Sequence, residues 1–263
     1  MKKTVLSITL IILSTFAFSQ TKPDISQIDD PKSLPVLFQQ SAAEYRALCY
    51  QAFNLAELRI SCINKRDIKR NHLAIITDLD ETILDNSYSE ANLIMEGKTY
   101  TSAAWKKWTN LSAATAVPGA IDFLKYVHDK GIEIYYISNR KTDELASTLK
   151  NLQKLGLPNA DEAHTLLYST ESPKEVRRQL VMKDHKVVML LGDNLNDFAE
   201  VFEKKTINQR FQSTDDFRKE WGNKFIVLPN PVYGEWENAL YNYDFKLSPE
   251  EKKATRLQLL KGY

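Results

Sequence analysis

The stretch that decides the fold is Leu73-Ala74-Ile75-Ile76-Thr77-Asp78-Leu79-Asp80-Glu81-Thr82. Its first five residues are mostly apolar and partly β-branched, which predicts a short buried strand. Two carboxylates, those of Asp78 and Asp80, follow where this strand ends. Acidic residues in loops are usually only solvated, so the meaning of this D-x-D-x-T pattern depends on the rest of the chain.

The same pattern of an apolar strand with a polar end recurs along the chain. Further strands are predicted over 132–137, 165–168, 187–191 and 225–228. Helices are predicted over 118–131, 143–155, from Pro173 onward, from 196–202 onward, and over 235–241 and 249–260. Nearly all-apolar strands that alternate with helices predict a parallel sheet covered on both faces. The expected fold is therefore α/β and Rossmann-like, with ligands bound outside the carboxyl ends of the strands.

Two segments fall outside this alternation. Residues 20–72 are predicted to be helical, with one long helix over 33–66, because that stretch lacks glycine and carries apolar residues at helical spacing. Residues 85–117 are polar and aromatic and show no strand alternation. They are predicted to form a small, mainly helical insertion.

Cys49 and Cys62 both lie in the predicted long helix. On one straight helix they would be separated by about 20 Å, whereas the Cα atoms of a disulfide lie about 4.4–6.8 Å apart. A disulfide therefore requires the helix to break between them. Two buried free thiols are expected instead.

The first nineteen residues have the pattern of a secretory signal peptide. Two lysines precede an apolar run over 5–16, and the small residues Ala17 and Ser19 suit cleavage before Gln20. The run is too short to remain comfortably as a helix across a bilayer of about 30 Å. The mature protein is expected to be exported to the periplasm without stable insertion into the membrane.

Length and composition exclude several classes of protein. The chain has 263 residues, 43% apolar and 26% charged, which suits one large or two small globular domains rather than a disordered, collagen-like or polytopic membrane protein. A net charge of +1 provides no field that would recruit a nucleic-acid polymer. Two cysteines and no C-x-x-C or Cys/His cluster argue against a disulfide scaffold and a zinc site.

Chemically distinctive residues follow three of the predicted strands and open one helix. They are Asp78 and Asp80, then Ser138-Asn139-Arg140-Lys141, then Lys174, then Gly192-Asp193-Asn194-Leu195-Asn196-Asp197. Because the carboxyl ends of parallel strands share one edge of a sheet, all four sets are expected in one crevice. This order of D-x-D-x-T, Ser, Lys and G-D-x-x-x-D is far more specific than any of its parts.

The ordered set resembles the haloacid dehalogenase (HAD) superfamily of phosphatases. The likeness to class C bacterial acid phosphatases, the lipoprotein 5′-nucleotidase group, is carried further by Asp85-Asn86-Ser87, Ala116-Val117-Pro118-Gly119-Ala120 and Leu228-Pro229-Asn230-Pro231-Val232-Tyr233-Gly234. The resemblance runs from about residue 35 to the C-terminus. It implies a HAD-like core over 73–84 and 118–263, with 85–117 as a cap. A homodimer is compatible with the sequence.

The resemblance bears on membrane attachment. Members of this group are usually lipid-anchored through a cysteine at the signal cleavage site, whereas the first cysteine here is Cys49. A form without a lipid anchor is therefore expected.

Four carboxylates, those of Asp78, Asp80, Asp193 and Asp197, would repel one another in this crevice. Two unit charges about 4 Å apart cost about 4 kcal/mol at an effective dielectric constant near 20, so the cluster requires a cation. Every candidate ligand is a hard oxygen, which favours Mg²⁺ over zinc. The resemblance implies that Asp78 and Asp193 bind the ion through carboxylates and Asp80 through its backbone carbonyl. Asp197 is then expected to orient ligands or water from behind.

Cleavage of a phosphate ester needs an in-line attacking group and positive charge against the phosphoryl oxygens. Asp78 is expected to be the nucleophile that forms an aspartyl-phosphate, and Asp80 the acid and base that protonates the leaving alkoxide and later deprotonates water. Lys174 is expected to offset the charge of the phosphate and Asp78, with a solvated lysine as the alternative. Ser138 and Asn139 are expected to donate hydrogen bonds to the phosphate.

Two aromatic residues, Trp105 and Tyr233, occupy the positions that hold the organic part of the substrate in the family pattern. Stacking would bind a nucleobase without reading its identity, although packing against the core is an equal alternative for Trp105. For Trp108, packing is the favoured interpretation. Arg140 is expected either to contact phosphate or to cap the sheet edge, and Glu81 to be structural, with its side chain pointing away.

The remaining titratable residues are assigned no chemistry. The four histidines (His72, His128, His164 and His185) match none of the motifs, which argues against a histidine acid phosphatase. The basic run 174–178 is interrupted by an acid and is expected to be a solvated helix face.

Three functions are compatible with these features. The leading one is a secreted, Mg²⁺-dependent acid phosphatase that hydrolyses nucleoside 5′-monophosphates. The second is a phosphatase or phosphotransferase for other small phosphate esters. The third is a non-catalytic nucleotide- or haem-binding relative, against which the intact Asp78, Asp80, Lys174 and Asp193 argue.

Overall fold

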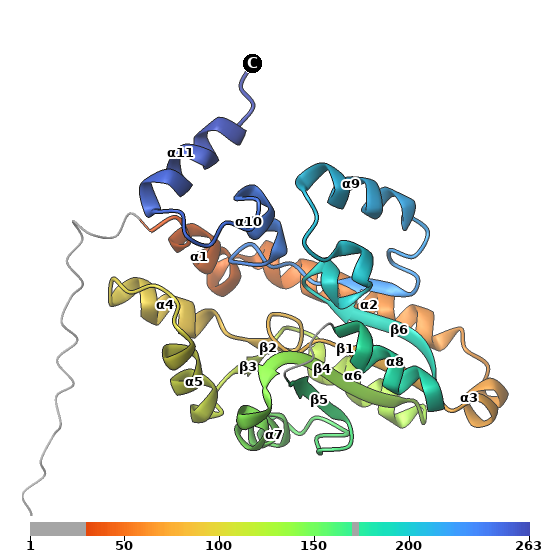
Figure 1. Ribbon diagram of the computed structural model, residues 1–263. Helices are drawn as coiled ribbons and strands as arrows, with labels where there is room; N and C mark the ends of the chain where they lie inside the picture. Colours follow the sequence, from red (N-terminus) through yellow and green to blue (C-terminus); the bar gives the residue numbers. More distant parts are fainter. Residues whose placement is uncertain (1–29, 170–173) are drawn as a thin grey trace, which may run out of the picture.

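The computed structural model describes residues 30–169 and 174–263. The predicted signal peptide and Pro173 lie outside these residues. A five-stranded parallel sheet with the order β5-β4-β1-β6-β7 runs through the middle of the molecule (Figure 1). Its strands are β1 (Leu73–Thr77), β4 (Glu133–Lys141), β5 (Thr165–Tyr168), β6 (Lys186–Gly192) and β7 (Phe225–Val227). The predicted α/β class and parallel sheet are confirmed.

The central strand, β1, explains why the sheet is covered on both sides. All five of its residues are buried, and alternate side chains enter different clusters. Leu73 and Ile75 belong to one core cluster, whereas Ala74 and Ile76 belong to the other. A strand buried on both faces has to be apolar throughout, as this one nearly is.

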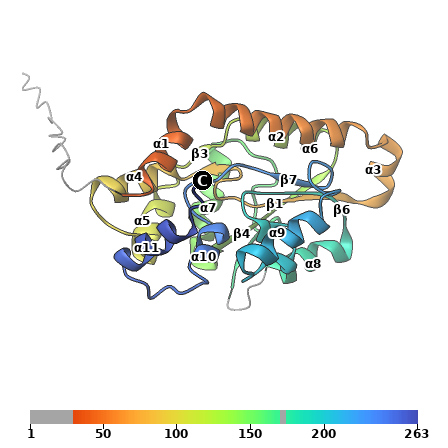
Figure 2. The ribbon, with the colours of Figure 1, turned by 90° about the horizontal axis from the view of Figure 1, so that it is seen from above.

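Helices cover the two faces separately. Figure 2 shows α2 (Ala43–Ser61) and α6 (Ala120–Asp129) on one side of the sheet, and α8 (Lys174–Asp184) and α9 (Ile207–Asp216) on the other. On the first side, the rings of Phe53 in α2 and Phe123 in α6 pack with their centroids 5.5 Å apart. α7 (Leu145–Lys154) contributes Leu152 to the same cluster.

β4 is longer than predicted, because it continues to Lys141 rather than ending at Ile137. Its pairing with β5 shifts register between Ile137 and Lys141. A bulge of this kind redirects side chains next to a site. Residues 138–140 therefore lie within the irregular end of the strand, not in a loop after it.

The predicted helix over 33–66 is three helices: α1 (Ser33–Ser41), α2 and α3 (Lys65–Asn71). Ala42 is extended, and the side chain of Asn64 caps α3 by accepting a hydrogen bond from the backbone N–H of Arg66 at 2.9 Å. The extended Ala42 interrupts the helix between α1 and α2, and the Asn64 cap starts α3 as a separate helix.

The expectation of two buried thiols is wrong for Cys62. Cys49 is fully buried on the stripe that α2 presents to the core, and both cysteines are free. Cys62 is exposed, because it is the C-terminal cap of α2 and lies beyond this stripe.

The insertion over 85–117 is mainly helical in the structure. It contains α4 (Ser87–Met95) and α5 (Ser102–Leu111), which lie beside the carboxyl ends of the strands (Figure 1). A two-stranded antiparallel ribbon of β2 (Leu84–Asp85) and β3 (Thr115–Ala116) joins the insertion to the sheet. These strands are too short for the alternation by which strands are recognised.

The helix predicted from Asn196 is wrong. Two short 3₁₀ turns, Leu195–Asp197 and Glu200–Phe202, occupy this region, and α9 begins only at Ile207. The first turn is closed by Asp197, whose Oδ2 accepts a hydrogen bond from the backbone N–H of Asn194 at 3.0 Å. This contact holds Asp197 at the end of β6.

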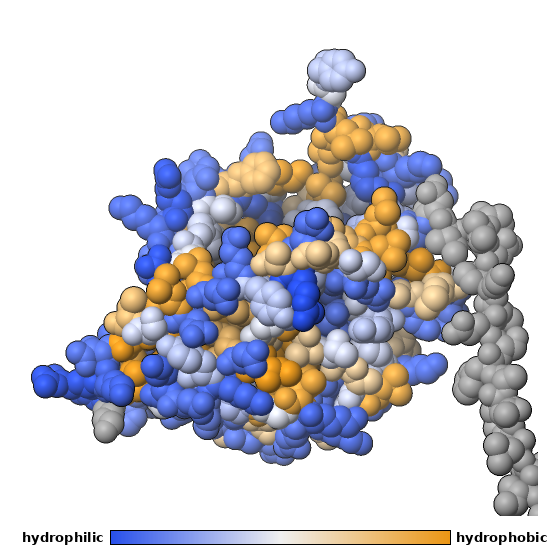
Figure 3. Space-filling model, turned by 180° about the vertical axis from the view of Figure 1, so that it is seen from behind, coloured by the Kyte–Doolittle hydropathy of each residue, from blue (hydrophilic) through white to orange (hydrophobic). Residues whose placement is uncertain are grey.

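The C-terminal part adds α10 (Glu235–Leu240) and α11 (Pro249–Leu259), as predicted. Seen from behind, hydrophilic residues and smaller apolar areas are interspersed on the surface (Figure 3). Within residues 30–169 and 174–263, no helix combines the length and the apolar character needed to span a bilayer.

Candidate active site

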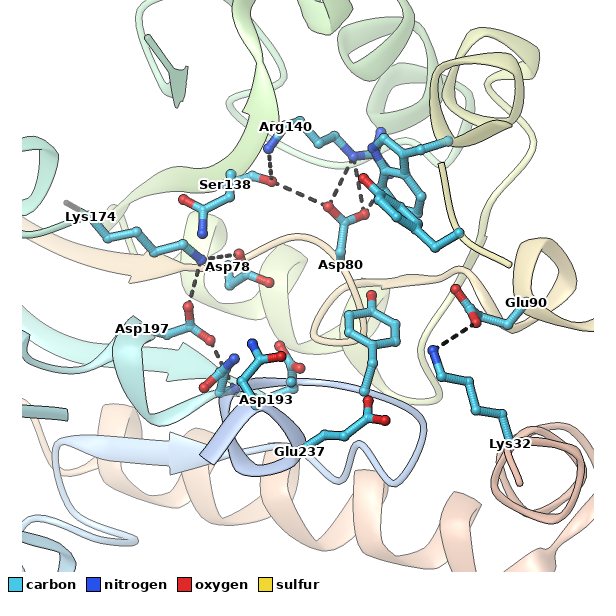
Figure 4. Close-up of a pocket in the computed structure, with 17 residues that line it drawn as sticks. Lys32, Asp78, Asp80, Glu90, Ser138, Arg140, Lys174, Asp193, Asp197 and Glu237 are labelled. Atoms are coloured by element: carbon cyan, nitrogen blue, oxygen red, sulfur yellow. Dashed lines mark hydrogen bonds and ion pairs between the residues drawn. The ribbon is translucent and has the colours of Figure 1, made fainter. Parts of the chain in front are cut away.

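A pocket of about 360 Å³ lies at the carboxyl ends of β1, β4 and β6, and the inserted helices contribute Glu90 and Trp105 to its lining (Figure 4). All nine residues that the sequence predicts for the site line this one pocket. Its lining consists of Lys32, Asp78, Asp80, Glu90, Tyr100, Trp105, Ser138, Asn139, Arg140, Lys174, Asp193, Asn194, Asp197, Tyr233, Gly234, Glu237 and Asn238. The residues that follow the parallel strands therefore meet in one pocket, as predicted from the parallel topology.

Lys174 lies between two carboxylates in the pocket, those of Asp78 and Asp197 (Figure 4). Its ammonium group donates to Asp78 Oδ1 and, at 2.5 Å, to Asp197 Oδ1. All three side chains are buried, so the alternative of a solvated lysine is excluded. Although burial opposes the charged form, the neighbouring Asp197 and Asp78 carboxylates raise the pKa of Lys174.

Asp78 is held at the end of β1 by its own backbone, whose N–H donates to Leu191 O of β6 at 3.0 Å. Burial raises the pKa of Asp78 well above its usual range, and nearby Asp197 and Asp193 add to this effect, while Lys174 opposes it. A group of buried acids in such surroundings is stabilised by additional positive charge.

Three carboxylates can hold a metal ion together. Oxygens of Asp78, Asp193 and Asp197 all lie within 4.8 Å of one another. Burial, followed by the charge of Asp197, raises the pKa of Asp193 to about 8. Asp193 is also fixed by Thr82 Oγ1 at 3.1 Å and Asn230 Nδ2 at 2.8 Å. The donor set consists only of hard oxygens and fits a divalent ion such as Mg²⁺.

The Asp80 carboxylate is outside this cluster and faces Arg140 (Figure 4). Arg140 Nη2 donates to Asp80 Oδ1 at 2.7 Å, and Ser138 Oγ donates to Asp80 Oδ2 at 3.3 Å. The Arg140 side chain is only 1% exposed. The two predicted alternatives for Arg140, a phosphate contact and a cap on the sheet edge, did not include this ion pair.

Two arginines that follow Lys174 on α8 were missed from the sequence. The run 174–178 is not a solvated face, because Arg177 and Arg178 are both buried. Arg177 donates to Ser138 O at 2.5 Å and to Asn139 Oδ1 at 2.9 Å, which orients the predicted phosphate-binding residues. Their spacing of one helical turn from Lys174 was the available signal.

Arg178 supports the other side of the pocket. Its Nη1 donates to the backbone carbonyls of Asn196 and Asp197, both at 2.9 Å. These hydrogen bonds give acceptor partners to the buried guanidinium and stabilise the turn that carries Asp197.

The aromatic residues separate into two groups. Trp105 and Tyr233 line the pocket, whereas Trp108 packs against the core and donates from Nε1 to Asn86 Oδ1 at 2.8 Å. Packing is therefore confirmed for Trp108. Glu81 is buried outside the pocket lining and accepts a hydrogen bond from the Tyr233 hydroxyl.

Comparisons with known proteins identify the family of this chain. The family model described as HAD superfamily, subfamily IIIB (Acid phosphatase) matches residues 19–236. The class C acid phosphatase from Bacillus anthracis is 43% identical, has a TM-score of 0.85, and is matched over 90% of this chain and 99% of that chain. The crystal structure of the class C acid phosphatase from Bacillus anthracis with tungstate bound gives 44% identity, a TM-score of 0.84, and the same coverage.

Proposed function

Because the chain belongs to the acid phosphatases of HAD subfamily IIIB, which hydrolyse phosphate monoesters, we propose that its substrates are nucleoside 5′-monophosphates. We propose further that the reaction uses Mg²⁺ and an aspartyl-phosphate intermediate. The observation that carries the proposal is the contact of buried Lys174 with both Asp78 and Asp197, beside Asp193. Tungstate bound to the Bacillus anthracis enzyme supports an oxyanion site, since tungstate is tetrahedral like phosphate.

The metal would be held by Asp78, Asp193 and the backbone carbonyl of Asp80, while Asp197, which contacts Lys174, would orient ligands or water. Two of these ligands, the carboxylates of Asp78 and Asp193, belong to the cluster whose oxygens lie within 4.8 Å of one another, and Asp197 is its third member. The part of the Asp80 carbonyl is what the family resemblance implies. The chemistry that bound Mg²⁺ supplies is neutralisation of the carboxylates and of the phosphoryl oxygens.

Asp78 is the proposed nucleophile. Its carboxylate oxygen attacks phosphorus, the bond from phosphorus to the leaving oxygen breaks, and an aspartyl-phosphate forms. Lys174 already contacts Asp78, so its charge is placed to offset both this carboxylate and an incoming phosphoryl group. Ser138 and Asn139, which line the same pocket, would donate hydrogen bonds to the phosphoryl oxygens.

Asp80 is the proposed acid and base. It gives a proton to the leaving alkoxide and takes one from the water that attacks the aspartyl-phosphate. It lines the pocket next to Asp78, and its carboxylate is not one of the three in the acidic cluster.

The nucleoside would lie between the inserted helices and the loop after β7. Trp105 comes from α5 and Tyr233 from that loop, and both line the pocket. Aromatic stacking contributes about 1–3 kcal/mol per base without distinguishing bases. The segment 85–117 would thus be a cap over the HAD-like core of 73–84 and 118–263. We also propose that residues 1–19 direct export to the periplasm.

The decisive experiment compares the wild type with Asp78→Asn on p-nitrophenyl phosphate with added Mg²⁺. The variant should lose all measurable turnover while its circular dichroism spectrum is unchanged. A variant with normal turnover would rule out the aspartyl-phosphate.

A panel of AMP, NMN and sugar phosphates tests the substrate class. AMP should have the highest kcat/KM because only nucleotides with a base can stack on Trp105. A clear preference for sugar phosphates would contradict the stacking argument and favour a broader phosphatase.

A further inference from the structure

We propose that Arg140 is a positioning residue that fixes the Asp80 carboxyl group in the direction needed for proton transfer. The inference rests on the proposed role of Asp80 as acid and base. It assigns to Arg140 a function in the proton-transfer step, distinct from binding of the phosphate.

The Arg140–Asp80 contact involves both carboxylate oxygens. Arg140 Nε lies 3.1 Å from Oδ1 and 3.2 Å from Oδ2, and Nη2 lies 2.7 Å from Oδ1. A planar guanidinium that binds both oxygens of a carboxylate sets its orientation as well as its position. A lysine at the same place would supply charge but no such fork.

The other contacts of Arg140 explain why the phosphate is not its partner. Nη1 donates to Thr148 Oγ1 at 3.2 Å, and Nη2 also reaches Asn86 Oδ1 at 3.5 Å. All three guanidinium nitrogens therefore have acceptors within the protein. With a side chain that is 1% exposed, Arg140 is a fixed support rather than a surface cation that reaches for a ligand.

Asn86 and Ser138 complete the support of Asp80. Asn86 Nδ2 donates to Asp80 Oδ1 at 2.9 Å, and Asn86 is itself held by the Trp108 indole. Ser138 Oγ donates to Oδ2 at 3.3 Å. The Oδ1 atom thus receives the shortest bonds, and Oδ2 the weaker ones, so Oδ2 is the oxygen that exchanges the proton.

The step that Arg140 supports transfers one proton in each direction. The electron pair of the bond from phosphorus to the leaving oxygen goes to that oxygen, which takes the proton of the Asp80 carboxyl group. Asp80 later receives a proton from the water whose oxygen attacks phosphorus and releases Asp78. Both transfers depend on direction, since a misplacement of about 1 Å can cost about 100-fold in rate.

The test compares Asp80→Asn, Arg140→Met and the double variant on two substrates with excess Mg²⁺. AMP releases a strongly basic alkoxide that needs a proton, whereas p-nitrophenyl phosphate releases a weakly basic phenolate that does not. The measured quantity is kcat/KM, which reports the steps up to aspartyl-phosphate formation. General acid catalysis is worth about 100-fold or more, so Asp80→Asn should lower kcat/KM for AMP by about that factor and for p-nitrophenyl phosphate far less.

Arg140→Met should show the same selective loss, about 10- to 100-fold for AMP. The double variant should match Asp80→Asn within about twofold, because residues that act through one another are not additive. Arg140→Lys, which keeps the charge but not the fork, should lie between the wild type and Arg140→Met.

Arg210→Met is the matched control, since Arg210 is also a buried arginine but lies on α9 outside the pocket lining. It should leave the ratio of the two substrates unchanged. Equal losses on both substrates in Arg140→Met, or a double variant far below Asp80→Asn, would overturn the proposal. Equal losses of kcat/KM for AMP and p-nitrophenyl phosphate in Asp80→Asn would overturn it too. Failure of the aspartyl-phosphate proposal is seen separately, as normal turnover in Asp78→Asn.

Discussion

The hydroxyl of Tyr233 donates a hydrogen bond to Glu81, 152 residues earlier in the chain. This bond joins the loop after β7 to the turn that follows β1. Glu81 also accepts a hydrogen bond from the backbone N–H of Asn86 at 2.9 Å. Its carboxylate therefore links the start of the inserted segment to the loop that carries Tyr233. The hydrogen bond thereby fixes the Tyr233 side chain, which lines the pocket.

Tyr233→Phe and Tyr233→Ala should distinguish the effect of the Tyr233 hydroxyl from that of its ring. Phenylalanine keeps the ring but leaves a buried Glu81 oxygen with fewer partners, which should lower the free energy of unfolding by about 1–3 kcal/mol. Alanine removes the stacking surface, so kcat/KM for AMP should fall by about 5- to 150-fold. Ribose 5-phosphate, which has no base, should be much less affected. Equal losses on both substrates in Tyr233→Ala would contradict stacking.

Glu81 should also make the stability depend on pH. Burial, followed by the charge of Asp80, raises the pKa of Glu81 from its ordinary value of 4.5 to about 8. A raised pKa in the folded state stabilises the protein below pH 4.5, and this contribution is lost as the pH rises to about 8. Urea unfolding should therefore show the wild type losing stability relative to Glu81→Gln between pH 5 and pH 8. A constant difference between the two proteins would contradict the burial argument.

Removal of the metal should abolish activity and lower stability. EDTA should stop AMP hydrolysis and added Mg²⁺ should restore it. Mg²⁺ at about 100 times its dissociation constant should add about 2.7 kcal/mol to the unfolding free energy, seen as a higher Tm. Asp193→Asn should lose both responses, whereas Asp129→Asn, at an exposed position on α6, should keep them. If Asp193→Asn kept both responses to Mg²⁺, Asp193 would not be a ligand of the metal.

Gly192 should be intolerant of any side chain. A Cβ atom there would lie 2.7 Å from Asp197 Cγ, so Gly192→Ala must displace the residue that contacts Lys174. We expect a loss of about 1–3 kcal/mol in stability and about 100-fold in kcat with AMP. Gly262→Ala is the control, because nothing lies within 4 Å of an added Cβ there. An active Gly192→Ala variant would show that the position of Asp197 is not critical.

The two cysteines should differ in reactivity. Burial raises the pKa of the Cys49 thiol to about 11, and only the thiolate reacts readily with disulfide reagents. The native protein should therefore release one equivalent of thionitrobenzoate from DTNB, through exposed Cys62, and the second only in denaturant. Cys62→Ser should release none while folded. Rapid labelling of that variant would show that Cys49 is accessible.

The strands, and the order in which reactive residues follow them along the chain, could be predicted because both depend on local sequence. Residues 73–77 are apolar since the strand is buried on both faces, and parallel topology then brings every strand end to one edge. The end of β4 could not be predicted in this way. A register shift between Ile137 and Lys141 depends on pairing with β5, not on the periodicity of β4 itself.

The breaks in the N-terminal helix and the short turns after β6 show a similar limit. Ala42 is extended between α1 and α2, and the 3₁₀ turn at Asp197 is closed by the hydrogen bond that Asp197 accepts from the backbone N–H of Asn194. Helical periodicity continues through both regions, so it predicts helices that are longer than those observed.

By itself, the sequence determined which reactive groups follow which strands, because a buried parallel strand leaves a readable apolar run with its polar residues at the end. Only the tertiary structure decided the partners of those groups. Arg140 pairs with Asp80, which lies 60 residues earlier in the chain. Arg177 and Arg178 are buried and donate to backbone carbonyls at the ends of two different strands. Such pairings arise when distant segments pack together and buried charges must find acceptors, which no local pattern encodes.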